Sequence, residues 1–233
     1  MFKELFDSYN VRARLSVYVI LITPVVTSFY VLYAPMRSIG ASTMLLIVLA
    51  AFSNYFLILL RHFAKHHYFS ETAAQFLRPT DGHIDSITKA RYYSILSSFN
   101  AAFGSMTQDT ADNDVKATCN DIITWLKNKT RDNHLIQEEN TLYGFINNLY
   151  NLKLIGLMVT ILSMIIQIII LRPKLCGITT ILLESHPSKF LVIMDFAFLL
   201  FWTIGVSLRI CKSAAEKYAY ALLGSIDSLT KRK

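Results

Sequence analysis

Residues 154–171, LIGLMVTILSMIIQIIIL, form a predominantly apolar run without a charged residue between Lys153 and Arg172. A helix needs about 20 apolar residues, with a working range of about 17–25, to cross the hydrocarbon core of a bilayer. Runs of similar length occur at residues 15–33, 38–60 and 190–208. The sequence therefore predicts an all-α integral membrane protein, with four transmembrane helices in two hairpins and a helical cytoplasmic domain between the hairpins.

Lysine and arginine are distributed unevenly between the segments that these runs separate. Nineteen of the 23 lie before the first run, between the second and third, or after the fourth, and the two hairpin loops hold four. Because positively charged loops stay on the cytoplasmic side, we expect both termini and the middle domain in the cytoplasm. This bias also accounts for the net charge of +7. We therefore expect the lipid bilayer as a partner and no direct nucleic-acid binding.

The apolar runs divide the chain into five segments. These are an N-terminal interfacial segment, a first transmembrane hairpin, a cytoplasmic helical domain, a second hairpin and a cytoplasmic C-terminal helix, at residues 1–14, 15–60, 61–153, 154–208 and 209–233. In the first segment, apolar side chains alternate with charges in a pattern that suits a short helix on the inner leaflet: Phe2, Leu5, Phe6 and Tyr9. A frayed terminus is the alternative.

The middle domain carries apolar stripes at helical spacing. One follows an Asp81-Gly82 turn and contains Ile84, Thr88, Tyr92, Ile95, Leu96, Phe99 and Phe103. A second, opened by Asp112 or Asp114 as N-cap, contains Val115, Cys119, Ile122 and Leu126. A third, without a breaker before the third span, contains Leu142, Phe145, Leu149 and Leu152. After the fourth span comes a further face of Ala214, Ala215, Tyr218, Leu222, Ile226 and Leu229. We expect the third and fourth spans to extend into the cytoplasm as continuous rods.

The sequence has no P-loop, GxSxG, HExxH or Gly-rich dinucleotide motif. The cysteines form no CxxC pair, and we expect isolated buried thiols at Cys119, Cys176 and Cys211. His62, His66 and His67 offer a candidate metal face, although their place beside Arg61 and Lys65 favours residues at headgroup level. Four aspartates suit a solvated loop and a helix start: Asp109, Asp112, Asp114 and Asp121. We predict a protein that is not an enzyme and has no cofactor and no metal.

Three polar side chains interrupt the apolar runs, namely Asn54, Gln167 and Asp195. Such groups are costly in lipid and often mark functional sites. Gln167 lies four residues before the outer end of its span and Asp195 five residues after the outer end of the next, so both are expected at a similar depth. One interpretation is a polar ring that lines a pore, within one subunit or across an oligomer. The other is a structural Gln–Asp contact, or an aspartate that reaches the interface beside Lys189.

Pro24 lies within the first run and is expected to kink its helix. A proline removes one backbone donor, which leaves a carbonyl of the preceding turn without its usual partner. Neighbouring hydroxyl side chains can satisfy backbone groups freed in this way: Thr23, Thr27 and Ser28.

Spaced polar and aromatic residues recur over residues 70–157. They are Phe76-Leu77-Arg78, Asp81, Ile84-Asp85, Thr88-Lys89, Arg91-Tyr92, Thr130-Arg131-Asp132, Glu139-Asn140, Tyr143-Gly144-Phe145, Asn148-Leu149, Leu152-Lys153 and Gly156. In these motifs the chain resembles a family of uncharacterised bacterial four-span membrane proteins with a helical cytoplasmic insert. It departs from their pattern at four positions: Ile146, Asn147, Tyr150 and Leu154. More loosely, it resembles the small transmembrane effectors of bacterial anti-phage systems. The resemblance implies a bacterial inner membrane protein, but no reaction.

The same motifs bring charged residues of both signs close to turns. The basic group is Arg78, Lys89, Arg91 and Arg131, and the acidic group is Asp81, Asp85, Asp132 and Glu139. We expect ion pairs between the two groups to hold the helices of the middle domain together. A latch that a partner or ligand opens is the alternative.

These features favour a non-enzymatic membrane effector that perturbs or permeabilises the inner membrane when its cytoplasmic domain is triggered, in anti-phage (abortive infection) defence. We expect a homo-oligomer, with a cytoplasmic protein or nucleoprotein partner encoded nearby. An ion channel, a transporter or a transporter accessory subunit is one alternative, although transporters usually carry inverted repeats and broken helices. A membrane scaffold protein without any flux is the other.

Overall fold

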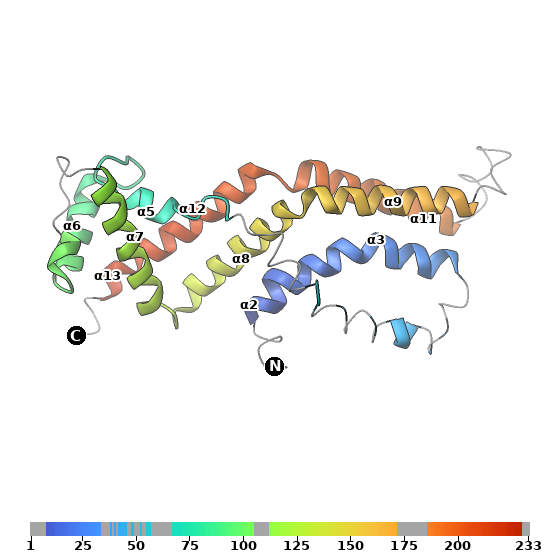
Figure 1. Ribbon diagram of the computed structural model, residues 1–233, viewed down its shortest axis with the longest axis horizontal. Helices are drawn as coiled ribbons and strands as arrows, with labels where there is room; N and C mark the ends of the chain where they lie inside the picture. Colours follow the sequence, from blue (N-terminus) through green and yellow to red (C-terminus); the bar gives the residue numbers. More distant parts are fainter. Residues whose placement is uncertain are drawn as a thin grey trace. The chain divides into compact units, whose positions relative to one another are not determined.

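The computed structural model describes residues 8–33, 67–104, 112–171 and 186–229, with isolated positions between residues 38 and 56. All regular secondary structure in these ranges is helical, as predicted (Figure 1). Several predicted features lie outside the described residues: most of the span at 38–60, with Asn54, and also His62, His66, Asp109 and Cys176.

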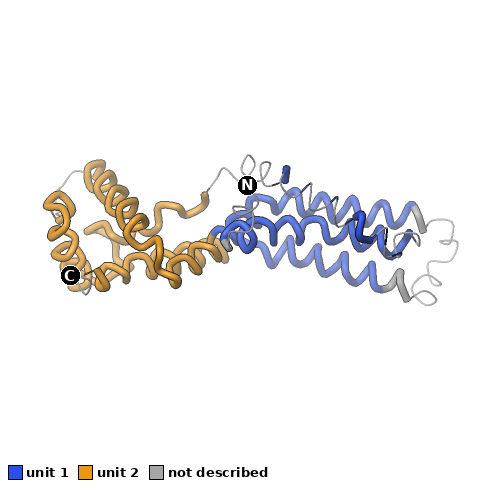
Figure 2. The backbone as a smooth tube through the Cα atoms, turned by 90° about the horizontal axis from the view of Figure 1, so that it is seen from below, with its two compact units in different colours: residues 1–66, 144–208 blue, residues 67–143, 209–233 orange. Residues whose placement is uncertain are grey.

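The chain folds into two compact units, each built from two separate stretches of sequence (Figure 2). Unit 1 contains residues 1–66 and 144–208, and unit 2 contains residues 67–143 and 209–233. The C-terminal segment therefore belongs to the same unit as the middle domain. The first residues after 143, which we assigned to the middle domain, belong to the unit that holds the apolar helices.

Unit 1 consists of helices from both of its stretches of sequence. They are α2 (Ser8–Asn10), the π-helix η1 (Val11–Leu15), α3 (Ser16–Leu32), the end of α8 (His134–Asn151), α9 (Lys153–Leu171), α11 (His186–Leu200) and the π-helix η5 (Phe201–Gly205). The helices α3, α9 and α11 lie side by side and pack pairwise (Figure 1).

One helix, Val11–Leu32, is long and apolar enough to cross a membrane by itself. The described residues contain up to three such spans if each of two bent helix pairs counts as one, His134–Asn151 with Lys153–Ile169 and Phe190–Gly205 with Leu208–Leu229. Helices of this length and composition indicate association with a membrane. The predicted span at 38–60 lies mostly outside the described residues.

Residues 8–14 do not form a separate interfacial helix, because α2 and η1 run directly into α3. Arg14 donates from Nη1 to Asn10 Oδ1 at 2.7 Å within this first part of the helix. Asn148, on α8, donates from Nδ2 to the Ala13 carbonyl at 2.8 Å. A π-turn leaves carbonyls poorly aligned with its own donors, so this external donor stabilises η1.

The predicted continuous rods are wrong, because both are bent. The first bends by 57° at Leu152, where Asn151 Nδ2 donates to the Asn147 carbonyl at 2.8 Å and competes with the backbone. The second bends by 60° beyond η5, at Val206 with extended backbone angles (φ −95°, ψ 99°). There Lys153 Nζ donates to the carbonyls of Thr203 at 2.9 Å and Val206 at 2.7 Å, and so satisfies backbone groups that the bend leaves open.

The apolar core of unit 1 lies at these bends. Its buried members are Val17, Leu21, Leu149, Leu152, Trp202 and Val206. The indole of Trp202 is fully buried and packs closely against α9 at Gly156. A Cβ at Gly156 would fall inside the van der Waals radius of three indole carbons, so only glycine permits this approach of η5 to α9.

We expect Gly156→Ala to destabilise unit 1 by about 1–3 kcal/mol, because the added methyl group overpacks a site that has no free volume. Thermal unfolding of the detergent-solubilised protein, followed by circular dichroism, measures the loss. Gly224→Ala is the control, since a Cβ at Gly224 meets nothing within 4 Å. Equal melting temperatures for the two variants would contradict the expectation.

Unit 2 is a helical module. It contains α5 (Thr72–Leu77), α6 (Ser86–Ser97), the 3-10 helix η3 (Ala101–Gly104), α7 (Asp112–Lys129), the first turns of α8, α12 (Leu208–Gly224) and α13 (Ile226–Leu229). The first turn of α7 contains Asp112 and Asp114, near the predicted N-cap position. Helix α6 is capped instead by Asp85, whose Oδ1 accepts from Thr88 N at 2.8 Å. This hydrogen bond lowers the pKa of the Asp85 carboxyl.

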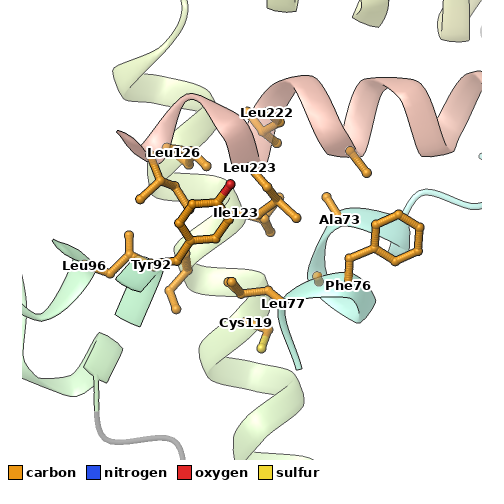
Figure 3. Packing of buried hydrophobic residues seen from close by; sticks show 14 of the residues in the cluster. Ala73, Phe76, Leu77, Tyr92, Leu96, Cys119, Ile123, Leu126, Leu222 and Leu223 are labelled. Atoms are coloured by element: carbon orange, nitrogen blue, oxygen red, sulfur yellow. The ribbon is translucent and has the colours of Figure 1, made fainter. Parts of the chain in front are cut away.

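A single apolar core holds unit 2 together (Figure 3). Side chains of α5, α6, α7 and α12 meet there, among them Phe76, Leu77, Tyr92, Leu96, Cys119, Ile123, Leu126, Leu222 and Leu223. The predicted stripe of α7 is buried at all four positions. The predicted C-terminal face contributes Leu222 and Ile226 to the same core. The amphipathic C-terminal helix is therefore an integral part of the module.

Candidate functional site

Four polar side chains lie inside unit 1, where α3, α9 and α11 pack against one another. Ser28 comes from α3, Ser163 and Gln167 from α9, and Asp195 from α11, and none is more than 5% exposed. We refer to these four residues as the polar cluster. Ser163 and Gln167 stand four residues apart, so they share one face of α9.

Hydrogen bonds join α3 to α9 through the polar cluster. Gln167 Nε2 donates to Ser28 Oγ at 2.7 Å and to Ser163 Oγ at 3.3 Å. The two serine oxygens lie 2.8 Å apart. Both hydroxyls also donate to the carbonyl of Pro24, Ser28 at 2.6 Å and Ser163 at 3.2 Å. In an apolar surrounding such bonds hold two helices in a fixed register.

The carboxyl group of Asp195 is buried without a normal hydrogen bond. Its side chain is 1% exposed, and in the described part of the chain neither oxygen has a hydrogen-bond partner. The side-chain amide of Gln167, which donates to the two serines, lies close enough to interact with the carboxyl group. An unpaired buried carboxylate is one of the most costly arrangements in a protein, so this group has a charge state or a partner that compensates the cost.

A cavity of about 170 Å³ lies next to the polar cluster. Ser28 and Ser163 contribute to its lining, together with apolar side chains of α3 and α9 that include Val25, Phe29, Leu32 and Ile166. Tyr33, which follows the last residue of α3, also lines it. The cavity therefore reaches from the C-terminal end of α3 to the two hydroxyl groups.

The structure brings Gln167 and Asp195 together, as their similar predicted depth indicates, and adds two serines that the sequence analysis did not assign to this site. The signal for Ser28 was present, because it stands four residues after Pro24. We expected it to bond to a carbonyl freed by the proline, which is that of Ile20. It bonds instead to the carbonyl of Pro24 itself, and this brings its oxygen into reach of α9. Asn54 lies outside the described residues.

The charged residues of unit 2 pair differently from our expectation. Lys89 is buried, and its Nζ donates to the Arg78 carbonyl at 2.6 Å and to the Asp81 carbonyl. Burial lowers the pKa of Lys89, and attraction by Asp81 offsets part of this shift. The Asp81 carboxylate accepts from the backbone N–H of His83 at 2.8 Å. Lys89 therefore ties the end of α5 and the turn after it to α6.

The other predicted ion-pair residues also have partners that differ from the predicted ones, or have no ion pair among the described residues. Arg91, on α6, forms two contacts of 3.0 Å with Asp227 on α13. Arg78 lies 3.8 Å from an oxygen of Asp112, at the start of α7. In the ranges that the structure describes, no ion pair includes Arg131, Asp132 or Glu139, and the first two are exposed. These contacts stabilise the packing of unit 2, and they do not form a single network.

Other candidate groups remain separate from one another. Cys119 and Cys211 are buried free thiols, and burial raises the pKa of the Cys119 thiol to about 11. Among the described residues, no group of three or more His, Cys, Asp or Glu side chains is arranged to hold a metal ion. The polar cluster is therefore the strongest candidate site.

Comparison of the chain with protein-family models, with curated proteins and with solved structures found no match. The resemblance of residues 70–157 to a bacterial membrane protein family stays a prediction. Any functional assignment has to come from the polar cluster and its surroundings.

We expect Gln167→Leu to lower the stability of unit 1 by about 0.5–2 kcal/mol, because it removes two hydrogen bonds between side chains within a helical bundle. The unfolding midpoint in detergent measures this change. Ile168→Leu, at the next and exposed position of α9, is the matched control and should unfold as the wild type does. An unchanged midpoint for Gln167→Leu would mean that its hydrogen bonds do not hold α3 to α9.

We expect Lys89→Met to destabilise unit 2 by about 2–4 kcal/mol, since it leaves two carbonyls without their donor. Lys116→Met is the control, because Lys116 forms an exposed 3.0 Å pair with Glu71 and such pairs contribute about 1 kcal/mol or less. Thermal unfolding followed by near-ultraviolet circular dichroism distinguishes the two variants. Similar losses in both would show that burial of Lys89 has no special role.

Proposed function

We propose that this protein is a non-enzymatic membrane effector, whose membrane-embedded unit becomes permeable when its helical module receives a signal. The observation that carries this proposal is the carboxyl group of Asp195, which is buried among apolar helices without a hydrogen bond in the described part of the chain. Ionisable groups are rare at such positions, and they usually mark ion or proton pathways. A purely structural residue at this place would be apolar.

The polar cluster supports a role in conduction better than a role in packing alone. Serine and glutamine at the helix contact satisfy one another, and they leave the carboxyl group outside this set of bonds. The cavity of about 170 Å³ brings open volume to the same hydroxyl groups. A polar path through a helical bundle can be built from such elements: a cavity, then hydroxyl groups, then a carboxyl group.

The way the chain is shared between the units supports control by unit 2. Helices α8 and α12 each contain residues of both units. A change in the packing of unit 2 therefore acts on segments that continue into unit 1. We infer that a ligand or protein bound to unit 2 triggers the effector, and that several copies assemble around the permeation path.

A bacterial inner membrane location and a role in defence against phage follow from the resemblance of residues 70–157 and belong to this proposal. The loss of membrane potential in an infected cell is an outcome that needs no catalytic residue. This agrees with the absence of common catalytic motifs from the sequence.

Expression in bacterial cells that contain a potential-sensitive dye tests the proposed function. We expect the wild type to depolarise the cells and to arrest growth. Asp195→Asn should lose most of this effect while it still inserts into the membrane, because the variant keeps the volume of the side chain and removes the ionisable group. The matched control is Asp121→Asn, at an exposed position of α7, which should act as the wild type does.

Three outcomes contradict the proposed function. If the wild type leaves potential and growth intact, the protein is not an effector of this kind. Substrate-selective flux of the purified protein in vesicles at rest would indicate a channel or transporter. Absence of any flux, together with recovery of a stable partner, would indicate a scaffold.

A further inference from the structure

The cavity between α3 and α9 follows one face of each helix. Its lining on α3 recurs at helical spacing, with Val25, Ser28, Phe29 and Leu32, and Tyr33 follows directly after the helix. Ser163 and Ile166 line it from α9. From Val25 to Leu32 the lining extends along α3 for about 10 Å at a rise of 1.5 Å per residue. The space is therefore long and narrow for its volume of about 170 Å³.

The two hydroxyl groups in this lining have partners within the protein. Ser28 donates to the Pro24 carbonyl at 2.6 Å, and Ser163 Oγ lies 3.2 Å from the same carbonyl oxygen. Nε2 of Gln167 donates to both serine oxygens. A buried water molecule needs about two to four polar partners, and the other described side chains of the lining are hydrocarbon apart from the phenol of Tyr33. The cavity therefore favours an apolar occupant over water.

The size and the entrance of the cavity suit an alkyl chain. An apolar protein cavity of about 150 Å³ stays dry and binds benzene, a molecule of about the volume of a six-carbon chain. The cavity beside α3 is slightly larger than that. Phe29 and Tyr33 are 52% and 54% exposed, so the lining reaches the surface of unit 1. The described lining residues include no charged side chain, as expected for a site that holds neutral hydrocarbon.

The place of the cavity in the fold identifies the occupant. Helix α3 is the main part of Val11–Leu32, which is long and apolar enough to cross a membrane by itself. The hydrocarbon that surrounds such a helix consists of lipid acyl chains, and one leaflet contributes a layer of about 15 Å. A lining of about 10 Å along α3 fits within that layer. We propose that the cavity is a lipid site, which holds one acyl chain of a phospholipid between α3 and α9.

A bound acyl chain keeps water away from the polar cluster. Ser28 and Ser163 line the cavity and also join α3 to α9 through Gln167. Hydrocarbon in the cavity covers these hydroxyls, so the polar path is closed at this end while the chain is bound. This consequence rests on the proposed function, whereas the lipid site itself does not.

Photolabelling in vesicles of phosphatidylethanolamine and phosphatidylglycerol tests the lipid site. The vesicles contain a small amount of phosphatidylethanolamine with a diazirine in one acyl chain, and mass spectrometry identifies the labelled residues after illumination. In the wild type we expect label on Val25 and Ile166, which line the cavity from α3 and from α9. Ile161, at an exposed position of α9, reports the ordinary contact of the protein surface with lipid.

Variants that fill the cavity distinguish a bound chain from surface contact. Ile166→Phe fills it from α9, so label on Val25 should fall by a factor of about ten, equivalent to about 1.4 kcal/mol, while label on Ile161 stays the same. Val25→Phe fills it from α3 and should lower the label on Ile166 in the same way, so the test remains possible if one variant does not fold. Ile165→Phe, at the adjacent and exposed position, is the matched control and should keep the labels on Val25 and Ile166.

Three results would overturn the lipid site. Label on Ile161 but on neither Val25 nor Ile166 would mean that protein or water fills the cavity. Label on the two cavity residues that both filling variants leave unchanged would indicate ordinary contact with the bilayer. Equal label on these residues from a lipid with the diazirine in its headgroup would mean that the cavity does not hold the acyl chain.

The outcome for the lipid site is separate from that for the effector. The labels are read from the protein at rest, whether or not it conducts. The expected labels from vesicles that show no flux would retain the lipid site and refute the effector. Flux without label on the cavity residues would retain the effector and refute the lipid site.

Discussion

The interior of unit 1 is apolar and offers few hydrogen-bond partners, so the polar groups buried there have to satisfy one another. This constraint explains why Ser28, Ser163 and Gln167 meet at the contact of α3 with α9, and why both serines share the carbonyl of Pro24. It also explains the position of Lys153, whose ammonium group covers two carbonyls that η5 leaves open. Each of these side chains satisfies backbone or side-chain groups that water satisfies elsewhere. Among the described residues of this unit, the carboxyl group of Asp195 and the indole N–H of Trp202 are buried without a hydrogen-bond partner, and Asp195, as the ionisable group of the two, carries the functional argument.

The same requirement shapes unit 2, where one of the buried polar groups is a lysine. Lys89 brings a positive charge into an apolar core and meets two backbone carbonyls at the end of α5. The turn after α5 surrounds this ammonium group. The Asp81 carboxylate accepts from the backbone N–H of His83 and does not form a hydrogen bond with the ammonium group. The charged residues that we expected to pair with one another thus form separate local contacts. Such hydrogen bonds and ion pairs favour one packing of the helices, while the apolar contacts of the core supply most of the stability.

Helical periodicity predicted the helices of unit 2 well, because a stripe such as that of α7 has one physical meaning: its face is buried. The similar predicted depth of Gln167 and Asp195 along their spans also indicated correctly that the two side chains lie close together. The bends at Leu152 and Val206 could not be predicted in this way. The bend at Leu152 involves a bond from the Asn151 side chain to a backbone carbonyl. The bend at Val206 involves the side chain of Lys153, which is 53 residues away in the sequence. Periodicity contains no information on such contacts. The predicted ion pairs were wrong for the same reason, since the partner of Arg91 is 136 residues away in the sequence.

The two tryptophans of the chain are divided between the two units. Trp202 is fully buried in the core of unit 1, and Trp125 packs against Phe99 and Phe103 in unit 2. Each compact unit thus contains its own intrinsic fluorophore. Replacement of either indole by phenylalanine leaves an emission signal from the other unit alone, so the order in which the two units respond to a stimulus can be recorded without an attached label.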